Sequence, residues 1–439
     1  MLRRALYFGA VLPLALALAW ALSLGLPKLR ASFRQRQGVW KRLERRSARR
    51  DPARPLVWFH VSSAGEFLQM EPLLRRVRER GGQVAVTVTS VSALRWLERV
   101  APWPETVWAD LLPWEARGTA RRLYDALRPD AVVYAQSDLW PGLVWEGSRR
   151  GIPQCLLAAR LAARSARVRS PLLRWFYRDL YARMALILAA SEDDAAALST
   201  LVLRQGAAPG QGAVPVGGDP GMETVLRRLD EAPLPPYPAA TAAAPVLVAG
   251  STWPPDEALL REALRRVAPR IPGLRLVIAP HEPTPERLAG LEAAWADVGT
   301  ARLSQWEQAG RAAAPPVLLV DRVGRLAGLY RLGTLAYVGG AFTTGVHNVA
   351  EPAAAGLPVL FGPRFHNSAA AQALLEDELA QAVTDAPGLA AALLGLLKTP
   401  DRCARLGHRA RARIESMAGA AQTCWDALAA CVPALRPPR

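Results

Sequence analysis

The sequence is poor in cysteine. Its 439 residues include 4 cysteines, and no two of them form a Cys-x-x-Cys pair. A disulfide-stabilised mini-protein is therefore excluded, no metal site follows from the cysteines, and the thiols fit a reducing compartment. The 37 prolines and 33 glycines make up roughly 16% of the chain, below the ~25–30% typical of low-complexity chains. Most of the chain is therefore expected to fold.

Acidic residues are also scarce relative to basic ones. The chain has 38 Asp and Glu against 55 Lys and Arg, a formal net charge of +17. Such a charge predicts an anionic partner, either nucleic acid or a phospholipid surface. The sequence contains no recognised nucleic-acid motif, and many arginines follow an apolar N-terminal segment or alternate with acids, so the lipid surface is favoured.

That apolar segment covers residues 5–26 and carries no ionisable side chain apart from Tyr7. It is long enough to cross ~30 Å of hydrocarbon. Only Arg3 and Arg4 precede it, whereas ten basic residues follow it by Arg50. The positive-inside bias predicts a single-pass anchor with the large domains in the cytoplasm and basic residues near anionic headgroups. A cleaved secretory signal is the alternative, which the downstream arginines disfavour.

Short β-branched or aromatic runs alternate with longer amphipathic stretches, which predicts parallel sheets covered by helices. In the first half, strands are expected near Leu56–Val61, Val84–Thr89, Ala131–Tyr134, Gln154–Leu157 and Leu186–Ala189, and helices near Met70–Arg80, Glu115–Leu127 and Leu172–Ala185. In the second half, strands are expected near Val246–Ala249, Leu274–Ala279, Val317–Val320, Leu335–Val338 and Val359–Phe361. The fold class is α/β, with two Rossmann-like doubly wound domains.

A proline- and alanine-rich stretch separates the two halves and is typical of an interdomain linker. The predicted division is an anchor at 1–27, a basic juxtamembrane linker at 28–54, a first domain at 55–230, the Pro/Ala-rich linker at 231–245 and a second domain at 246–439. Two such domains are expected to face a cleft, with ligands at the carboxyl ends of the strands.

The first polar motif follows the first strand as His-Val-Ser-Ser-Ala-Gly-Glu, residues 60–66. Glu66 would project from this loop as a general base, with Gly65 allowing close approach of a ligand. The alternative is a capping box, in which Ser63 and Glu66 satisfy the N–H groups of the next helix. Spacing alone favours the cap.

Two more motifs follow later strands of the first half. Asp138, in Gln-Ser-Asp-Leu-Trp-Pro, could act as an acid, cap a helix or be a solvated loop residue. Arg160, in Ala-Arg-Leu, could hold a phosphate or carboxylate, or lie on the surface as an ordinary arginine.

In the second half, Ser251 and Thr252 close the first strand and precede a helix, where hydroxyl and N–H groups can hold a phosphate or simply form a turn. His281 lies in a stiff Pro-His-Glu-Pro turn and is equally ambiguous.

The most informative motif is glycine-rich and runs from residue 337 to residue 352. Gly339 and Gly340 permit close backbone approach, and a helix is expected to place His347 and Glu351 on one face, where a carboxylate could accept ribose hydroxyls. A zinc pair made by His347 and Glu351 is the competing hypothesis, but it lacks an identifiable third ligand.

Together these motifs, with Leu-Trp-Pro at 139–141, Ser-Glu-Asp-Asp-Ala at 191–195, Gly-Val-His-Asn-Val-Ala-Glu-Pro at 345–352 and Phe-Gly-Pro at 361–363, resemble the 3-deoxy-D-manno-octulosonic acid (Kdo) transferases in order and spacing. The resemblance covers about residues 55–379 and extends to the family's N-terminal anchor. It implies a GT-B, inverting, metal-independent transferase without cofactor. Such an enzyme moves Kdo from CMP-Kdo to a lipid A precursor at the cytoplasmic face of the bacterial inner membrane.

The resemblance also implies roles for residues of this chain. Glu66 would be the general base, with Ser63, Gly65, Asp138 and Arg160 as acceptor-side or structural candidates. The CMP pocket would be lined by Ser251, Thr252, His281, Gly339, Gly340, His347, Asn348 and Glu351, with Glu351 on the ribose.

The chain departs from the family pattern at three places. One is the Pro-His-Glu-Pro turn at 280–283, which lacks the arginine that many members have. Where the family has Glu-x-Glu, this chain has Gln136 and Asp138, and the basic residue expected near the donor is replaced by Gly221. A related GT-B lipid-linked transferase with another nucleotide-sugar donor, or a non-catalytic membrane-associated homologue, therefore stays open as an alternative.

Overall fold

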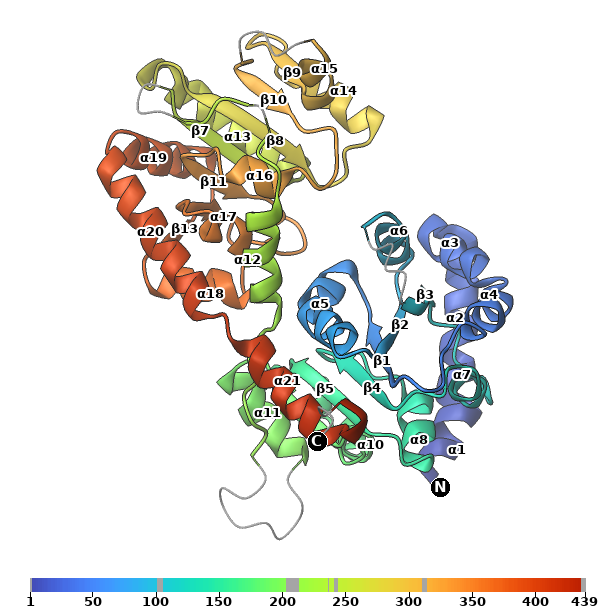
Figure 1. The fold of residues 1–439 in the computed structure, drawn as a ribbon. Helices are drawn as coiled ribbons and strands as arrows, with labels where there is room; N and C mark the ends of the chain where they lie inside the picture. Colours follow the sequence, from blue (N-terminus) through green and yellow to red (C-terminus); the bar gives the residue numbers. More distant parts are fainter. Residues whose placement is uncertain are drawn as a thin grey trace. The chain divides into compact units, whose positions relative to one another are not determined.

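The computed structural model describes residues 2–100, 106–202, 213–235, 237–240, 244–309 and 314–435. The chain forms two compact units, each with its own sheet (Figure 1). Unit 1 contains residues 1–224 and the C-terminal segment from Gly419, and unit 2 contains residues 225–418. Within the predicted linker, residues 236 and 241–243 lie outside the described residues.

The sheet of unit 1 has six strands in the order β3-β2-β1-β4-β5-β6, and every neighbouring pair is parallel. The strands are β1 Leu56–Val61, β2 Gln83–Val88, β3 Thr106–Leu111, β4 Ala131–Ala135, β5 Gln154–Ala159 and β6 Leu186–Ala189. Successive residues of β1 enter different cores, with Trp58 on one face of the sheet and Phe59 on the other. Every residue of β1 is therefore buried, as expected for a parallel sheet covered on both faces.

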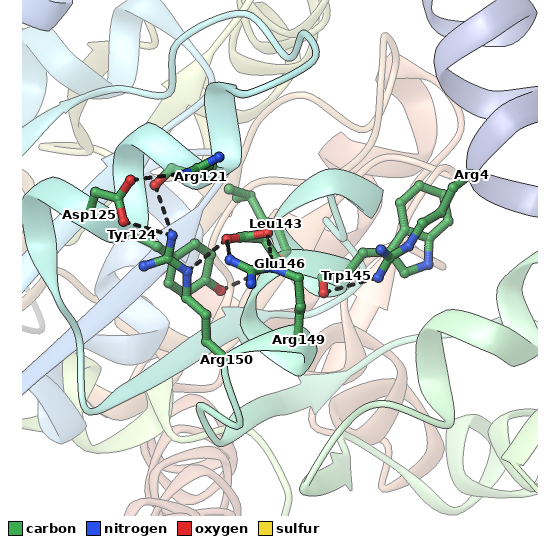
Figure 2. A network of polar contacts seen from close by, with 9 residues as sticks. All are labelled: Arg4, Arg121, Tyr124, Asp125, Leu143, Trp145, Glu146, Arg149 and Arg150. Carbon is green, nitrogen blue, oxygen red and sulfur yellow. Dashed lines mark hydrogen bonds and ion pairs between the residues drawn. The ribbon is translucent and has the colours of Figure 1, made fainter. Parts of the chain in front are cut away.

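Helices cover both faces of this sheet (Figure 1). They are α5 Ala64–Glu79, α6 Val91–Val100, α7 Thr119–Leu127, α8 Pro141–Arg149, α9 Ala166–Arg169, α10 Pro171–Tyr181 and α11 Glu192–Val202. Helices α7 and α8 are joined by charged side chains, because Arg150 of the α8 C-cap pairs with Asp125 at 2.7 Å and with Glu146 at 2.7 Å (Figure 2).

The C-terminal helix corrects the predicted division at 246–439. Helix α21, Ala420–Cys431, packs on α5 of unit 1, and Cys424, Trp425 and Leu428 enter the same core as β1. At its start, Glu223 accepts hydrogen bonds from the N–H groups of Gly419 and Ala421. The end of the chain therefore completes unit 1, which sequence order could not indicate.

The N-terminal region is helical throughout its described length. A continuous apolar helix at Leu2–Gly25, made of α1 Leu2–Leu6, a π-helical turn η1 Tyr7–Val11 and α2 Leu12–Gly25, is long and apolar enough to cross a membrane. The region predicted as a basic linker at 28–54 instead forms α3 Pro27–Arg36 and α4 Val39–Ser47. Val39 and Leu43 of α4 are buried in the core of unit 1.

The sheet of unit 2 has seven parallel strands in the order β13-β12-β11-β7-β8-β10-β9. The strands are β7 Val246–Thr252, β8 Arg275–Pro280, β9 Thr300–Arg302, β10 Val317–Leu319, β11 Leu335–Val338, β12 Val359–Phe361 and β13 Ala380–Ala382. The helices of unit 2 are α13 Pro254–Val267, α14 Pro285–Ala294, α15 Leu303–Gln308, α16 Leu326–Tyr330, α17 Ala350–Ala354, α18 Ala369–Glu376, α19 Ala386–Leu397 and α20 Pro400–Ser416. Helix α12, Gly221–Glu231, begins in unit 1 and ends in unit 2. A 3-10 turn lies in each unit, η2 Ala268–Arg270 in unit 2 and η3 Pro433–Leu435 in unit 1. The α/β prediction of two doubly wound parallel sheets is confirmed.

Candidate active site

Each sheet has a point where its strand order reverses. In unit 1, β1 lies between β2 and β4, and in unit 2, β7 lies between β8 and β11. At such a point the loops from neighbouring strands leave in opposite directions and open a crevice at the carboxyl ends of the strands. The motifs of Glu66 and Asp138 follow β1 and β4 in unit 1, and those of Ser251 and His347 follow β7 and β11 in unit 2, so the fold places them at these reversal points. Arg160 and His281 follow the next strands outward, β5 and β8.

Glu66 lies in the first turn of α5, immediately after β1. The Ser63 hydroxyl accepts a hydrogen bond from the Glu66 N–H at 3.2 Å and caps the helix, as the sequence predicted. The Glu66 carboxylate does not complete the capping box on Ser63. It accepts hydrogen bonds from the N–H of Ser62 at 2.6 Å and from the Ser62 hydroxyl. The carboxylate is half-buried, whereas Gly65 beside it is exposed.

The surroundings of Glu66 favour its protonated form. Burial raises its pKa above the ordinary value, against the opposing effect of the two hydrogen bonds from Ser62. The nearby Asp138 carboxylate raises the pKa further, and His60 lowers it. A carboxylate whose pKa is raised in this way is more basic than an ordinary glutamate, which suits it to accept a proton from an acceptor hydroxyl.

Asp138 follows β4 and ends a chain of hydrogen bonds that starts in the core. The Trp58 indole donates to the Thr87 hydroxyl at 2.9 Å, and that hydroxyl lies 2.8 Å from Nδ1 of the fully buried His60. The other ring nitrogen of His60, Nε2, lies 3.2 Å from Oδ2 of Asp138. Burial opposes ionisation of Asp138, but the hydrogen bonds from His60 and Thr89 hold its pKa below the ordinary value.

Arg160 pairs with Asp219 in unit 1 at 3.3 Å, just before α12. The Arg160 N–H donates to the carbonyl of Gln136, whose φ of 54° lies in the left-handed region. Gly221 packs against α5, because a Cβ at this position would lie 3.1 Å from the Cα of Gln69. The basic residue expected at position 221 would therefore have to displace backbone, which gives a packing reason for the glycine.

In unit 2, two residues at the end of β7 are constrained by their surroundings. Ser251 is held at a φ of 53°, and Thr252 is 1% exposed and donates its hydroxyl to Glu257 at 2.9 Å. The expectation that the Thr252 hydroxyl faces a phosphate is therefore corrected, because it is used inside the unit. Ser251 keeps a half-buried side chain.

Asp256, in the first turn of α13, joins the loops after β7 and β11. Its buried carboxylate accepts hydrogen bonds from the N–H of Trp253 at 2.9 Å, the N–H of Gly340 at 3.0 Å and the Tyr337 hydroxyl at 2.8 Å. A Cβ at Gly339 would lie 2.5 Å from the Ser251 carbonyl oxygen. Gly339 is thus needed for close packing of these two loops.

Three aromatic rings pack together over these loops. His281 stacks on Trp253, with ring centroids 5.0 Å apart, and on His347, with centroids 4.3 Å apart. The rings of Trp253 and His347 lie nearly in one plane, with an interplanar angle of 8°. The Trp253 indole also donates to Nε2 of His347 at 2.8 Å. Burial lowers the pKa of His347 to about 4, and the neighbouring His281 contributes to the shift. Because Nε2 accepts this bond, neutral His347 carries its proton on Nδ1 and can donate from there.

Replacing Trp253 with Phe is expected to raise the pKa of His347, because the aromatic packing stays and the indole N–H that stabilises the neutral ring is lost. Nitrogen-15 NMR of the two ring nitrogens across a pH titration measures both the tautomer and the pKa. An unchanged tautomer and titration curve in Trp253→Phe would contradict the assignment of the proton to Nδ1.

The expectation of a helix carrying both His347 and Glu351 is wrong. Helix α17 begins at Ala350, after Asn348 has accepted a hydrogen bond from the Ala350 N–H at 3.0 Å. His347 therefore lies in the loop, while Glu351 lies 3.6 Å from Arg228 of α12 with 14% of its side chain exposed. Burial raises the pKa of Glu351, and Arg228 opposes this shift. Among the described residues, no cluster of three or more His, Cys, Asp or Glu side chains that could hold a metal ion is found.

Comparison with known proteins connects this geometry to a family. Residues 31–210 match the family model described as 3-Deoxy-D-manno-octulosonic-acid transferase (kdotransferase). The 3-deoxy-D-manno-octulosonic acid transferase of Bordetella pertussis is 30% identical over 405 residues, which cover 87% of this chain and 89% of that protein. The chain belongs to this family. The Kdo transferase of Haemophilus influenzae is 24% identical, with 95% of each chain covered.

As a Kdo transferase, the protein is a glycosyltransferase, and its fold has solved counterparts. The structure of UDP-GlcNAc 2-epimerase from Neisseria meningitidis bound to UDP-GlcNAc matches 85% of this chain and 99% of that chain, with a TM-score of 0.57 and 13% identity. That likeness shows the two-sheet fold. At 13% identity it says nothing about the chemistry of the Kdo transferase.

Sequence reasoning missed two residues of the site of this Kdo transferase. Trp253 was not singled out, although it immediately follows Ser251 and Thr252, and its indole fixes His347. Asp256 was not singled out either, although its place three residues after Trp253 is the spacing of a capping carboxylate.

Proposed function

We propose that this enzyme transfers Kdo from CMP-Kdo to a hydroxyl group of a lipid A precursor, with Glu66 as the general base. The observation that carries the proposal is the position of the half-buried Glu66 carboxylate, with its raised pKa, at the strand-order reversal of unit 1. Family membership identifies the sugar, and this carboxylate is the group able to activate an acceptor hydroxyl.

In the proposed reaction, the acceptor oxygen attacks the anomeric carbon of Kdo while its proton passes to the Glu66 carboxylate. The new carbon–oxygen bond forms as the bond from the anomeric carbon to the CMP phosphate oxygen breaks, and CMP leaves with the electron pair. Attack opposite the leaving group inverts the anomeric configuration in one step and requires no covalent enzyme intermediate. The Ser62 hydrogen bonds orient the carboxylate and are exchanged for the acceptor hydroxyl.

The donor is proposed to bind at the reversal point of unit 2. Neutral His347 would offer its Nδ1 proton to an oxygen of CMP-Kdo, and His281 would hold the ring by stacking on its face. Ser251, Asn348 and Glu351 remain the proposed contacts to phosphate and ribose. Gly339 and Gly340 shape the loop through their packing.

Lowering the pH is expected to reduce activity as the Glu66 carboxylate becomes protonated. Because burial raises its folded-state pKa, the loss begins at a higher pH than for an ordinary glutamate, and activity is retained above that pKa. A pH profile of kcat under saturating substrates gives this value. An acidic limb at or below the ordinary glutamate pKa would contradict the proposed environment of the base.

Donor choice tests the proposal against a related transferase with another nucleotide sugar. Purified enzyme in detergent is incubated with a lipid A precursor and one of CMP-Kdo, a UDP-sugar or a GDP-sugar, and acceptor-dependent release of nucleotide is measured. Release of CMP alone is the expected result. Release of UDP or GDP instead would favour the alternative donor, and no release from any donor would favour a non-catalytic homologue.

A further inference from the structure

The apolar helix at Leu2–Gly25 is tied to the rest of unit 1 at its start and, beyond its end, through the helix α3 that follows it. Near its start, Arg3 pairs with Asp179 of α10 at 3.1 Å, and the Tyr7 hydroxyl donates to Glu115. Arg4 donates to the carbonyl oxygen of Trp145 at 3.2 Å and lies over the indole ring of this residue (Figure 2). Asp179 also accepts a hydrogen bond from the Trp145 indole at 2.7 Å, so the two residues that Arg3 and Arg4 contact hold each other in place.

After the helix ends, the chain returns to the same part of unit 1. Arg36 at the end of α3 donates to the carbonyl oxygens of Leu112 at 2.8 Å and Thr89 at 2.7 Å. The Phe33 ring lies 4.7 Å from the ring of Trp114, which is the residue next to the Glu115 that binds Tyr7. Tyr7 near the start of the apolar helix and Phe33 after its end therefore contact adjacent residues of a single loop.

This geometry conflicts with a single-pass anchor. A helix of 24 residues is roughly 36 Å long, so a helix that crosses a ~30 Å hydrocarbon layer carries its two ends to opposite sides. Here the contacts of Arg3, Tyr7 and Arg36 require both ends to lie on the side that holds unit 1.

One face of the helix is partly covered and the other is exposed. Residues 12, 16, 19 and 23, spaced by three or four, are less accessible than the residues beside them. The exposed side chains include Leu14, 71% exposed, and Trp20, 60% exposed. Since the covered face packs on protein and the open face is apolar, the helix needs no polar face, which explains its uniformly apolar sequence.

The flanking charge identifies what covers the open face. Residues 28–50 contain ten basic residues and one acidic residue, Glu44, and the side chains of Arg34, Lys41, Arg45 and Arg49 are exposed. An apolar face with a tryptophan, bordered by cations, matches the boundary between acyl chains and anionic headgroups. We propose that Leu2–Gly25 lies in the plane of an anionic phospholipid membrane, with both ends on the side of unit 1, and does not cross it.

The side of the membrane on which the N-terminus lies tests this proposal. Because the test uses no activity assay, failure of this proposal can be distinguished from failure of the proposed function. A Gly-Ser-Cys-Gly tag is placed before Met1 in a Cys431→Ser background, because the other three cysteines are buried. Spheroplasts of a Gram-negative host are treated with a membrane-impermeant maleimide before and after permeabilisation. Arg265→Cys, exposed on α13, in the same background without the tag is the matched control.

The expected result is labelling of both cysteines only after permeabilisation, with at least a tenfold increase. Labelling of the tag in intact spheroplasts would overturn the proposal in favour of a spanning helix, and loss of the tag from the mature protein would overturn it in favour of a cleaved signal. A spin label at Leu14, measured in anionic vesicles, reports how deep the helix lies in the bilayer. We expect Leu14 to lie about as shallow as a label at Leu24, whereas a position at the bilayer centre would contradict the in-plane helix.

Discussion

Glu66→Gln is expected to lower kcat by about 10²–10⁴-fold, the range that a positioned general base contributes. The amide keeps the size of the side chain but cannot take the proton of the acceptor hydroxyl. Affinity for CMP-Kdo should stay within about twofold, since the donor is placed on unit 2. Steady-state kinetics with both substrates, together with donor binding by calorimetry, measure the two quantities.

The control for this substitution separates the base from the helix cap. Ser63→Ala removes the hydroxyl that accepts the Glu66 N–H bond, which is expected to cost about 1 kcal/mol of unfolding free energy. It leaves the carboxylate able to accept a proton, so kcat should fall far less than in Glu66→Gln. Equal losses of kcat in both variants would assign Glu66 a capping role only.

Asp256→Ala is expected to have the largest effect on unit 2. The substitution leaves the buried N–H of Gly340, the N–H of Trp253 and the Tyr337 hydroxyl without their acceptor. At about 1–3 kcal/mol for each unsatisfied buried group, the total loss is about 3 kcal/mol or more. Because Trp253 and Gly340 shape the loops that hold His347, CMP-Kdo affinity should also fall at least tenfold. Urea unfolding and calorimetry measure the two effects.

Tyr337→Phe is the matched control, because it removes one of the three hydrogen bonds and keeps the carboxylate. It should cost about 1 kcal/mol and change donor affinity little. If Asp256→Ala were no more destabilising than Tyr337→Phe, the carboxylate would not join the two loops as described.

The sequence predicted the central strands of both sheets because they are buried on both faces and carry runs such as Leu-Val-Trp-Phe-His-Val. It missed the edge strands β9 and β13, whose residues are Thr-Ala-Arg and Ala-Gln-Ala. These strands are only three residues long and none of their residues is fully buried, so they carry no hydrophobic pattern. It also missed β3, Thr-Val-Trp-Ala-Asp-Leu, at the edge of the other sheet.

At the candidate site, the sequence located the motifs correctly, but it did not predict which groups their side chains contact. The cap by Ser63 followed from local spacing, whereas the chain from Trp58 to Asp138 joins three strands and depends on sheet order. The sequence pattern also failed to show that His347 and Glu351 do not share one face of a helix. The Asn348 side chain accepts a hydrogen bond from the Ala350 N–H, and α17 begins at Ala350, so His347 stays in the loop before the helix.

Mass spectrometry of the acceptor lipid shows whether this enzyme adds Kdo and whether the addition depends on Glu66. Wild-type enzyme and Glu66→Gln, prepared in the same detergent, are incubated with CMP-Kdo generated in situ and a tetra-acylated lipid A precursor. We expect a mass gain of one or more Kdo units with the wild type and a strongly reduced gain with the variant, which still binds CMP-Kdo. No Kdo addition by the wild type would contradict the proposed function, and equal addition by both proteins would contradict the role of Glu66.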